Sequence, residues 1–333
     1  MPTLVLIHIG EQWPHYLKDC IHQARLVNPV DTTKIVLLVN KCHFSRVLPL
    51  EGVYQIQVVY LEDLEKTANH RDFLDKIVTM VDLQFRKQYW QYVFERFFIL
   101  EEYCQQHNVN SLYMIETDNL VYVPLEIVKT TENLFTQGMA APFDNLEQGY
   151  PSFVFFRNKE AVQRFATYMI ECLRKEYLSD MKILGKFRKE HPEEVFAYPV
   201  LPPSCNTPLR PRYSQVGHTA KPEETSFLSH PNFPILFDAI AFGQAIGGID
   251  PRNTGGMNTV GYINESALYT VLETQFEWRK YYTLWLPFVN TLPLVNLHVH
   301  SKALSTFLSD SETTPQGHYN AKELETALQR DLN

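Results

Sequence analysis

Short apolar runs separated by segments with helical spacing dominate the N-terminal part of the chain, and this alternation constrains the fold most strongly. Residues 3–9, 34–39 and 54–60 form three such runs, and residues 12–27 between the first two have helical spacing. Runs rich in β-branched residues indicate buried strands, and strands that alternate with helices form β-α-β units. The pattern therefore predicts an α/β fold with a Rossmann-type sheet, mostly parallel and flanked by helices, and a nucleotide at the carboxyl ends of its strands.

The same periodicities predict the elements of the remaining chain. Prolines crowd residues 202–234, which we expect to form a long ordered loop or the wall of a cleft. Glycines mark a turn region over residues 247–262, and the polar tail is expected to end in an exposed helix over residues 320–331. The further expected elements are helices over residues 88–107, 159–175, 180–190 and 236–246, and strands over residues 110–115, 153–156, 196–201 and 293–300.

Charge and cysteine content narrow the class of protein. The 333 residues carry a net charge of −8 with Lys and Arg scattered along the chain, which argues against nucleic-acid binding and against a basic membrane-surface patch. Five widely spaced cysteines without a Cys-x-x-Cys pair predict neither a zinc site nor a disulfide framework, and they fit a cytoplasmic protein. The N-terminal sequence lacks the features of a signal peptide, and no apolar stretch is long enough to predict a membrane span.

The strongest local signal for chemistry is the segment from Leu112 to Tyr122, in which an apolar strand ends in Glu116-Thr117-Asp118. Alternate residues of an extended segment share one face, so the two carboxylates can bind one ion. Carboxylate oxygens are hard ligands that suit Mg²⁺ or Mn²⁺, and such an ion neutralises a departing diphosphate. The alternative interpretation is a polar turn that ends a strand, because an acidic-x-acidic triplet alone is weak evidence.

The order of motifs around this triplet resembles that of GT-A glycosyltransferases. A helix with Arg96, a strand and then Glu116-Thr117-Asp118 are similar to the arrangement around the D-x-D motif of that family, with Glu in place of the first Asp. The resemblance spans residues 3–307 and implies a GT-A-like fold with a metal at Glu116 and Asp118. Asp118 is the stronger candidate for direct contact with the metal, and Arg96 adds positive charge near the diphosphate.

Two later motifs follow in the order that the resemblance implies. Ser152 lies in residues 150–156, which are similar to the strand that lines the donor sugar. Asp180 opens the next expected helix, where these enzymes place a carboxylate on the acceptor side. Asp180 is therefore the candidate to contact or deprotonate the acceptor hydroxyl, and in a retaining enzyme it would only position substrates.

A histidine pair near the end of the chain offers a further metal ligand. His298 and His300 lie two apart on an expected strand, so they share one face, and Lys302 follows them. Imidazole is a common ligand of transition-metal ions, and the alternative for each histidine is a structural role in the core. The segment resembles the late His that completes the metal shell of GT-A enzymes, with a nearby Lys on the diphosphate. Which of the two histidines binds the metal stays open.

A glycine-rich loop precedes this segment and carries Asp250, Arg252 and Asn253. These side chains suit sugar hydroxyls or phosphate, and Asp250 is a second candidate for a catalytic carboxylate. The alternative is a plain surface turn, and the loop lacks the Gly-Lys-Ser/Thr of a phosphate-binding Walker A loop. Asp238, in the preceding expected helix, is a further acidic candidate. The block from Asp238 onward also looks like uncharacterised bacterial and large-virus glycosyltransferase-like proteins, which implies glycan or cell-envelope polysaccharide synthesis.

The end of the first strand is the expected position of the nucleoside. His8 can stack on a base or donate to it, and Gly10 leaves room for a ligand. The alternative for His8 is a structural role.

These observations predict a metal-dependent glycosyltransferase that moves a sugar from a nucleoside-diphosphate-sugar donor to a saccharide or other hydroxyl acceptor, with Mn²⁺ or Mg²⁺. We expect one catalytic domain over residues 1–308, with a nucleotide-binding half (1–125) and an acceptor and metal half (126–308), followed by a tail (309–333). One alternative is a nucleotidyltransferase or sugar-phosphate hydrolase on a similar sheet. Another is a non-catalytic glycan-binding protein that keeps the fold.

Overall fold

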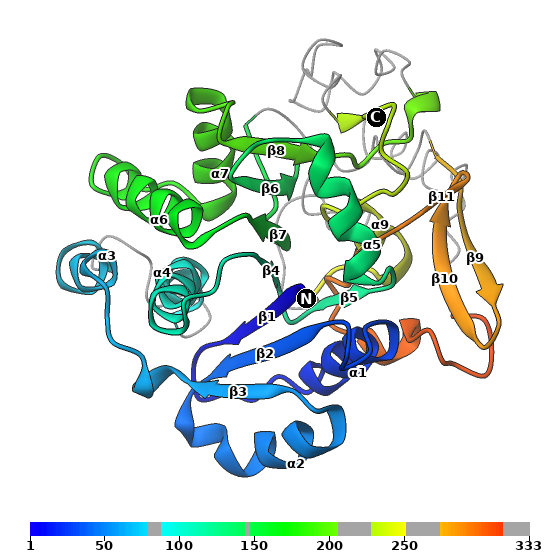
Figure 1. Cartoon of the computed structure of the whole chain (residues 1–333), viewed down its shortest axis with the longest axis horizontal. Coiled ribbons are helices and arrows are strands. Elements are labelled where there is room, and N and C mark those ends of the chain that lie inside the picture. The colour runs from blue at the N-terminus through cyan, green and yellow to red at the C-terminus, as the bar shows by residue number, and fades with distance from the viewer. Residues whose placement is uncertain (79–87, 144–146, 206–227, 251–273, 316–333) are drawn as a thin grey trace, which may run out of the picture.

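A seven-stranded sheet forms the centre of the computed structural model, which describes residues 1–78, 88–143, 147–205, 228–250 and 274–315 (Figure 1). The strand order is β3-β2-β1-β4-β7-β6-β8. The first four strands in this order are parallel, β7 is antiparallel to both neighbours, and β8 is parallel to β6. The predicted α/β class with a mostly parallel sheet is confirmed. The bounds are β1 (Thr3–His8), β2 (Lys34–Val39), β3 (Gln57–Tyr60), β4 (Leu112–Ile115), β6 (Met139–Pro142), β7 (Phe153–Phe156) and β8 (Val195–Tyr198).

The central strands are buried on both faces, which accounts for their continuous apolar sequences. Leu6 of β1 and Leu37 of β2 are 0% exposed, and the two strands pair along their whole length, from Thr3 opposite Lys34 to His8 opposite Val39. Because β1, β2 and β4 are parallel neighbours, their carboxyl ends meet at one edge of the sheet.

Helices cover both sides of the sheet (Figure 1). α4 and α6 lie on one side, where the rings of Phe97 and Phe165 pack 5.1 Å apart between their centroids, and α1 and α5 lie on the other. The aromatic face of α4 is thus part of the core rather than of a ligand cleft. The helix bounds are α1 (Leu17–Val27), α2 (Phe44–Tyr54), α3 (Ala68–Asp72), α4 (Tyr89–His107), α5 (Leu125–Thr130), α6 (Lys159–Leu173), α7 (Asp180–Glu190) and α9 (Ala241–Gly247).

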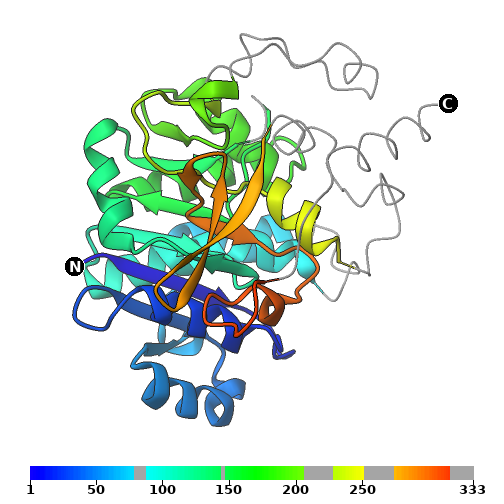
Figure 2. The same cartoon turned by 90° about the vertical axis from the view of Figure 1, so that its right-hand side faces the viewer.

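Two small sheets lie beside the main one. β5 (Asn119–Val121) pairs antiparallel with β12 (Asn296–His298), and this pairing sets His298 opposite Asn119. β9 (Phe276–Tyr281), β10 (Leu284–Val289) and β11 (Leu292–Pro293) form a three-stranded antiparallel sheet, drawn in orange in front of the main sheet in Figure 2. The pairing of β5 with β12 brings the segment after β4 against the C-terminal part of the described chain.

Several predicted boundaries differ from the structure. The strand expected from residue 54 begins at Gln57, because α2 continues to Tyr54. The strand expected over residues 293–300 is broken into β11 and β12. The helix expected over residues 236–246 begins only at Ala241, because the preceding residues lie against β12. Asp238 consequently precedes the helix instead of lying within it.

The hairpin of β9 and β10 was not predicted. Glu277, Arg279 and Lys280 interrupt its apolar residues, so the sequence resembles a solvated segment. Three other predictions lie partly or wholly outside the described residues. These are residues 206–227 of the proline-rich stretch, residues 251–262 of the glycine-rich turn, and the whole of the final helix over 320–331. Among the described residues, no helix combines the length and the apolar character needed to cross a membrane.

Candidate active site

Glu116 and Asp118 follow directly after β4, at the carboxyl edge of the central sheet. The Glu116 amide donates to the Ser152 carbonyl at 3.0 Å, and the Asn119 amide donates to the Glu116 carbonyl at 3.1 Å. The Asn119 side-chain amide donates to the same Ser152 carbonyl at 2.8 Å. These bonds hold the turn between β4 and β5, so that both carboxylates project from a rigid backbone.

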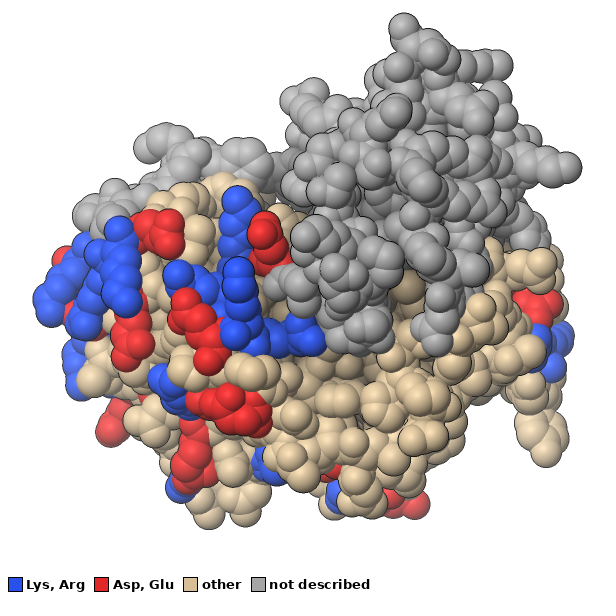
Figure 3. Space-filling model, turned by 90° about the horizontal axis from the view of Figure 1, so that it is seen from above, with Lys and Arg blue, Asp and Glu red and all other residues tan. Residues whose placement is uncertain are grey.

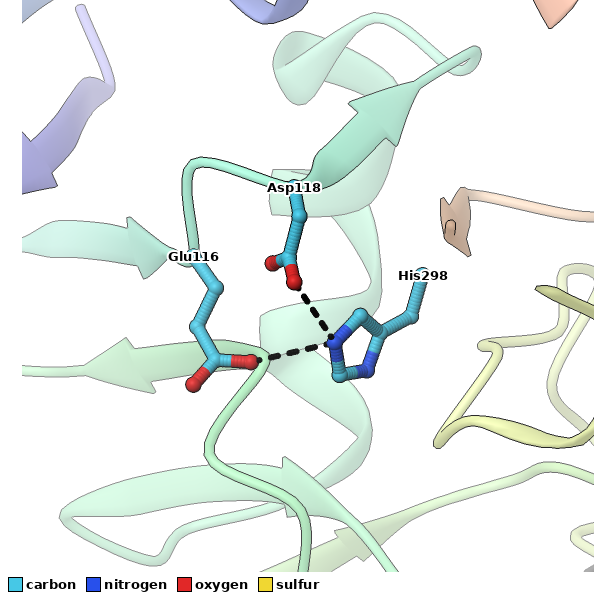
Figure 4. Close-up of side chains that lie close together, drawn as sticks. All are labelled: Glu116, Asp118 and His298. Carbon is cyan, nitrogen blue, oxygen red and sulfur yellow. Dashed lines mark ion pairs between the residues drawn. The ribbon is translucent and has the colours of Figure 1, made fainter. Parts of the chain in front are cut away.

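β12 supplies an imidazole to the same place (Figure 4). The Val299 amide donates to the Asp118 carbonyl at 2.9 Å, which continues the pairing of β12 beyond its last residue. His298 Nε2 lies 3.3 Å from Glu116 Oε2 and 3.5 Å from Asp118 Oδ2. One ligand atom from each of the three residues lies within 4.8 Å of the others, although the residues are far apart in the sequence.

The hydrogen bond at the other ring nitrogen of His298 assigns its tautomer. Nδ1 lies 3.1 Å from the Ala239 carbonyl oxygen, which can only accept, so Nδ1 carries a proton. In the neutral imidazole the lone pair is then on Nε2, which faces the two carboxylates. Metal-ligating histidines commonly donate their other N–H in this way. The three side chains therefore have the chemistry of a hard divalent-cation site, and Mg²⁺ or Mn²⁺ fits the donor set.

Two cationic side chains border the group. Arg96, from α4, donates to Glu116 through Nη1 and to Asp180 through Nη2 at 2.6 Å. Burial opposes the charge of Arg96, but the Glu116 and Asp180 carboxylates outweigh it and raise the pKa of the guanidinium. Lys302 donates to Asp118 through Nζ. The side chains of Arg96 and Lys302 are only 12% and 17% exposed, so both charges act in a partly desolvated region.

The pKa values of the two carboxylates on Arg96 shift in opposite directions. Burial raises the pKa of Glu116, but Arg96 and His298 outweigh it, so the pKa lies below its ordinary value. Burial raises the pKa of Asp180 to about 6, and the Glu116 charge adds to this while Arg96 opposes it. Asp180 also begins α7, where the Ser179 side chain accepts from the Lys182 amide at 3.3 Å. A buried carboxyl with a pKa near neutrality is suited to proton exchange.

The other sequence candidates in this region are placed differently. His300 does not belong to the group of Glu116, Asp118 and His298, and its Nδ1 accepts from the Asp250 amide at 2.8 Å. Asp250 is 3% exposed. Ser152 is fully buried, and its hydroxyl donates to the Ala239 carbonyl at 3.3 Å instead of facing a cleft. Arg252 and Asn253 lie outside the described residues.

A second set of polar and aromatic side chains lies at the carboxyl ends of β1 and β2. The Gly10 amide donates to Asn40 Oδ1 at 2.8 Å, and His43 Nε2 donates to the Gly10 carbonyl at 2.8 Å. The His43 ring centroid lies 5.2 Å from those of both His8 and Trp13. Burial, with a smaller contribution from His43, lowers the pKa of His8 to about 4 and keeps it neutral.

Sequence reasoning found His8 and Gly10 in this set but missed Trp13, Asn40 and His43. Asn40 lies just beyond β2, and Gly10 lies just beyond β1. Because neighbouring parallel strands end at the same edge of the sheet, their ends were the signal that could have indicated Asn40. Gly10 adopts φ +106°, and a Cβ there would lie 3.0 Å from the Tyr92 ring, so this position requires glycine.

Asp238 has a structural environment that its sequence did not reveal. It is 0% exposed and accepts hydrogen bonds from the amides of Phe242, Gly243 and His298, at 3.0, 2.9 and 3.0 Å. Burial raises its pKa to about 6 against these three bonds. The long sequence separation between Asp238 and His298 left no local signal for this contact.

Figure 3 shows Lys and Arg side by side with Asp and Glu on the left part of the described face, while most of the remaining described face carries neither.

No family model matches the sequence, and no curated protein matches it. Solved structures similar to the chain include glycosyltransferases. Mouse xyloside xylosyltransferase 1 is similar over 60% of this chain and 86% of its own, with 10% identity and a TM-score of 0.42. The galactosyltransferase LgtC, in complex with donor and acceptor sugar analogues, is similar over 70% of this chain and 88% of its own, with 13% identity and a TM-score of 0.42.

A cytidylyltransferase from Leptospira borgpetersenii is also similar, over 60% of this chain and 75% of its own, with 8% identity and a TM-score of 0.34. Likeness at this level assigns no activity to this chain.

Proposed function

We propose that this chain is a metal-dependent glycosyltransferase that moves a sugar from a nucleoside-diphosphate-sugar donor to an acceptor hydroxyl, in the synthesis of a glycan or cell-envelope polysaccharide. The convergence of Glu116, Asp118 and His298 at the carboxyl edge of the central sheet carries the proposal. Ligands bind at this edge in open α/β sheets, and two carboxylates with an imidazole suit a hard divalent cation.

In this proposal Glu116, Asp118 and His298 would hold Mn²⁺ or Mg²⁺. The ion would supply Lewis-acid stabilisation of the charge that develops on the departing diphosphate. Arg96 and Lys302 border the same group, and their positive charges would further stabilise a diphosphate. Asp180 would contact the acceptor hydroxyl, with its carboxyl ready to take a proton when ionised.

The nucleoside would bind at the ends of β1 and β2. His8, Trp13 and His43 offer aromatic faces there, and Asn40 is fixed by its bond to Gly10. The neutral state of His8 favours contact with an uncharged base over contact with phosphate. His300 and Asp250 would support the site from outside the metal group.

One observation favours a second candidate, a non-catalytic protein that keeps the fold. Arg96 and Lys302 already pair with Glu116 and Asp118, so the two carboxylates are neutralised without a metal. A cation would have to replace at least the Lys302 contact. This candidate predicts no metal-dependent binding of any sugar nucleotide.

Thermal-shift measurements with UDP-, GDP-, CMP- and dTDP-sugars, each with and without Mn²⁺, separate these functions. A rise in melting temperature with one donor, dependent on Mn²⁺ and lost in Asp118→Asn, supports the proposal. Glu126→Gln on the exposed side of α5 is the matched control and should respond like the wild type. Transfer of the sugar to an added acceptor, with release of nucleoside diphosphate (or of CMP from a CMP-sugar), indicates glycosyl transfer, whereas release of pyrophosphate from a nucleoside triphosphate indicates a nucleotidyltransferase. No stabilisation by any donor contradicts the proposal.

A further inference from the structure

A buried carboxylate holds together the backbone behind His298. Asp238 Oδ1 accepts from the Phe242 amide at 3.0 Å, and Oδ2 accepts from the amides of Gly243 at 2.9 Å and His298 at 3.0 Å. Both oxygens of one carboxylate thus join the first turn of α9 to the last residue of β12. Hydrogen bonds to a charged group are stronger than neutral ones, so this joint is firm.

The next residue contacts the His298 ring itself. The Ala239 carbonyl accepts from His298 Nδ1 at 3.1 Å and from the Ser152 hydroxyl at 3.3 Å. This carbonyl therefore fixes both the rotation of the imidazole and the nitrogen that carries the proton. The position of the carbonyl depends in turn on the Asp238 joint one residue earlier.

The turn at Asp238 and Ala239 is also fixed on its other side. Asn296 Oδ1 accepts from the Asp238 amide at 3.2 Å, and Asn296 Nδ2 donates to the Asp238 carbonyl at 3.0 Å. The same Nδ2 donates to Asn119 Oδ1 at 3.1 Å, next to Asp118. The backbone behind His298 and the turn with the two carboxylates are thus parts of one buried network.

We propose that Asp238 is a positioning residue, which holds the Ala239 carbonyl against His298 Nδ1 and so keeps Nε2 directed between Glu116 and Asp118. The alternative tautomer would place a proton on Nε2, where the two carboxylates are ready acceptors. That tautomer has no lone pair for a cation at this position. When the neutral ring donates from Nδ1 to the Ala239 carbonyl, the lone pair on Nε2 is available to a cation.

The consequence for metal binding rests on the proposed function, but the tautomer does not. Mutation of a residue that orients a metal-ligating histidine typically lowers the metal affinity by about 10- to 100-fold. In Asp238→Asn, an amide group would replace one acceptor oxygen and would face backbone N–H donors. We expect the turn to shift and the bond from Nδ1 to Ala239 to weaken.

The first measurement uses the full chain without metal. Long-range ¹H–¹⁵N correlation spectra report which imidazole nitrogen of neutral His298 carries the proton, with the signal assigned by its loss in His298→Gln. The wild type should show the Nδ1-protonated form, and Asp238→Asn should show the Nε2-protonated form or a mixture. A wild-type spectrum in which neutral His298 carries its only ring proton on Nε2 overturns the proposal, even if Asp238→Asn does not fold.

The second measurement is Mn²⁺ affinity, read from the paramagnetic resonance signal of the free ion. Asp238→Asn should weaken binding by about 10- to 100-fold. Glu101→Gln is the matched control, because Glu101 is also buried but bonds to Thr67 and Asn69, away from His298. The control separates a general loss of stability from a specific effect on the site and should keep the wild-type affinity.

The two measurements distinguish the possible failures. If Asp238→Asn folds and shows the same His298 tautomer and the same Mn²⁺ affinity as the wild type, Asp238 has only a structural role, and the inference is contradicted. A wild type that binds no Mn²⁺ contradicts the proposed function instead. The tautomer change in Asp238→Asn would still support the positioning role in that case.

Discussion

Arg96 reaches Asp180 from a different element of the fold: its Nη2 donates to Asp180 Oδ2 at 2.6 Å, while Nη1 binds Glu116. α4 supplies the guanidinium, the turn after β4 supplies one carboxylate and α7 supplies the other. A single cation thus links the carboxylates of Glu116 and Asp180. These two carboxylates cannot be displaced independently while this link holds.

Arg96→Gln should destabilise the protein by about 3 kcal/mol, because it leaves two partly buried carboxylates without their shared cation. The free energy of unfolding is measured with urea at neutral pH. In the double variant Arg96→Gln/Asp180→Asn, the loss should be smaller than the sum of the two single effects. Strict additivity would mean that the Arg96–Asp180 contact does not form in solution.

The stability of the wild type should depend on Asp180 in the acidic range. Its folded pKa of about 6 exceeds the ordinary value of 3.8, so the folded state favours the protonated carboxyl. The contribution is therefore fully present below pH 4 and is lost as the pH rises through about 6. Relative to Asp180→Asn, the wild type should lose at most about 3 kcal/mol across this interval. Unfolding titrations of both proteins between pH 4 and pH 7 measure the difference, and parallel curves would contradict it.

Six strands of the central sheet (β1, β2, β3, β4, β7 and β8) and the triplet after β4 could be predicted because their signals are local. The short strand β6 (Met139–Pro142) was not predicted. Continuous burial of β1 and β2 requires unbroken apolar sequences, and a strand that ends in Glu116 and Asp118 places both side chains at the carboxyl edge. β12 was predicted only as part of a longer strand. Its alternating pattern continues through His300, although the regular pairing ends at His298.

The rest of the site could not be predicted because it depends on contacts between distant segments. His298 and His300 have the same alternation in the sequence. Contacts with distant segments distinguish them: the Ala239 carbonyl lies at His298 Nδ1, and the Asp250 amide donates to His300 Nδ1. The sequence around Asp238 predicts a helix that includes this residue. In the structure Asp238 precedes α9, and its carboxylate accepts hydrogen bonds from the amides of Phe242 and Gly243 in the first turn of that helix. Neither the difference between His298 and His300 nor the hydrogen bonding of Asp238 has a signal within a short window of sequence.

Gly243 should tolerate no side chain. A Cβ at this position would lie 1.7 Å from the His298 carbonyl oxygen, which belongs to a strand backbone that cannot move aside cheaply. Gly243→Ala should therefore destabilise the protein by about 3 kcal/mol, the upper end of the usual cost of overpacking.

Gly52→Ala is the matched control for Gly243→Ala. Gly52 lies in α2, is exposed, and a Cβ there meets nothing within 4 Å. This variant should gain about 0.5–1 kcal/mol, because alanine is the better helix former. Urea unfolding of both variants checks the prediction, and equal stability of Gly243→Ala and the wild type would mean that α9 does not approach β12 this closely.

Lys302 should compete with a cation for Asp118. Its Nζ donates to the same Asp118 Oδ2 that faces His298, so an incoming Mn²⁺ must displace the ammonium group. Lys302→Met should therefore bind Mn²⁺ alone more tightly, by about tenfold or roughly 1.4 kcal/mol. The same variant should bind nucleoside diphosphate in the presence of Mn²⁺ more weakly, because the displaced ammonium would otherwise pair with the diphosphate.

These opposite effects of Lys302→Met distinguish an exchange of partners from a loss of fold. Calorimetric titrations with Mn²⁺ alone, and with nucleoside diphosphate at saturating Mn²⁺, measure both. Lys76→Met is the control, because Lys76 pairs with Asp72 on the surface and should leave both affinities unchanged. If Lys302→Met weakened both titrations together, Lys302 would support the shape of the site instead of occupying the cation position.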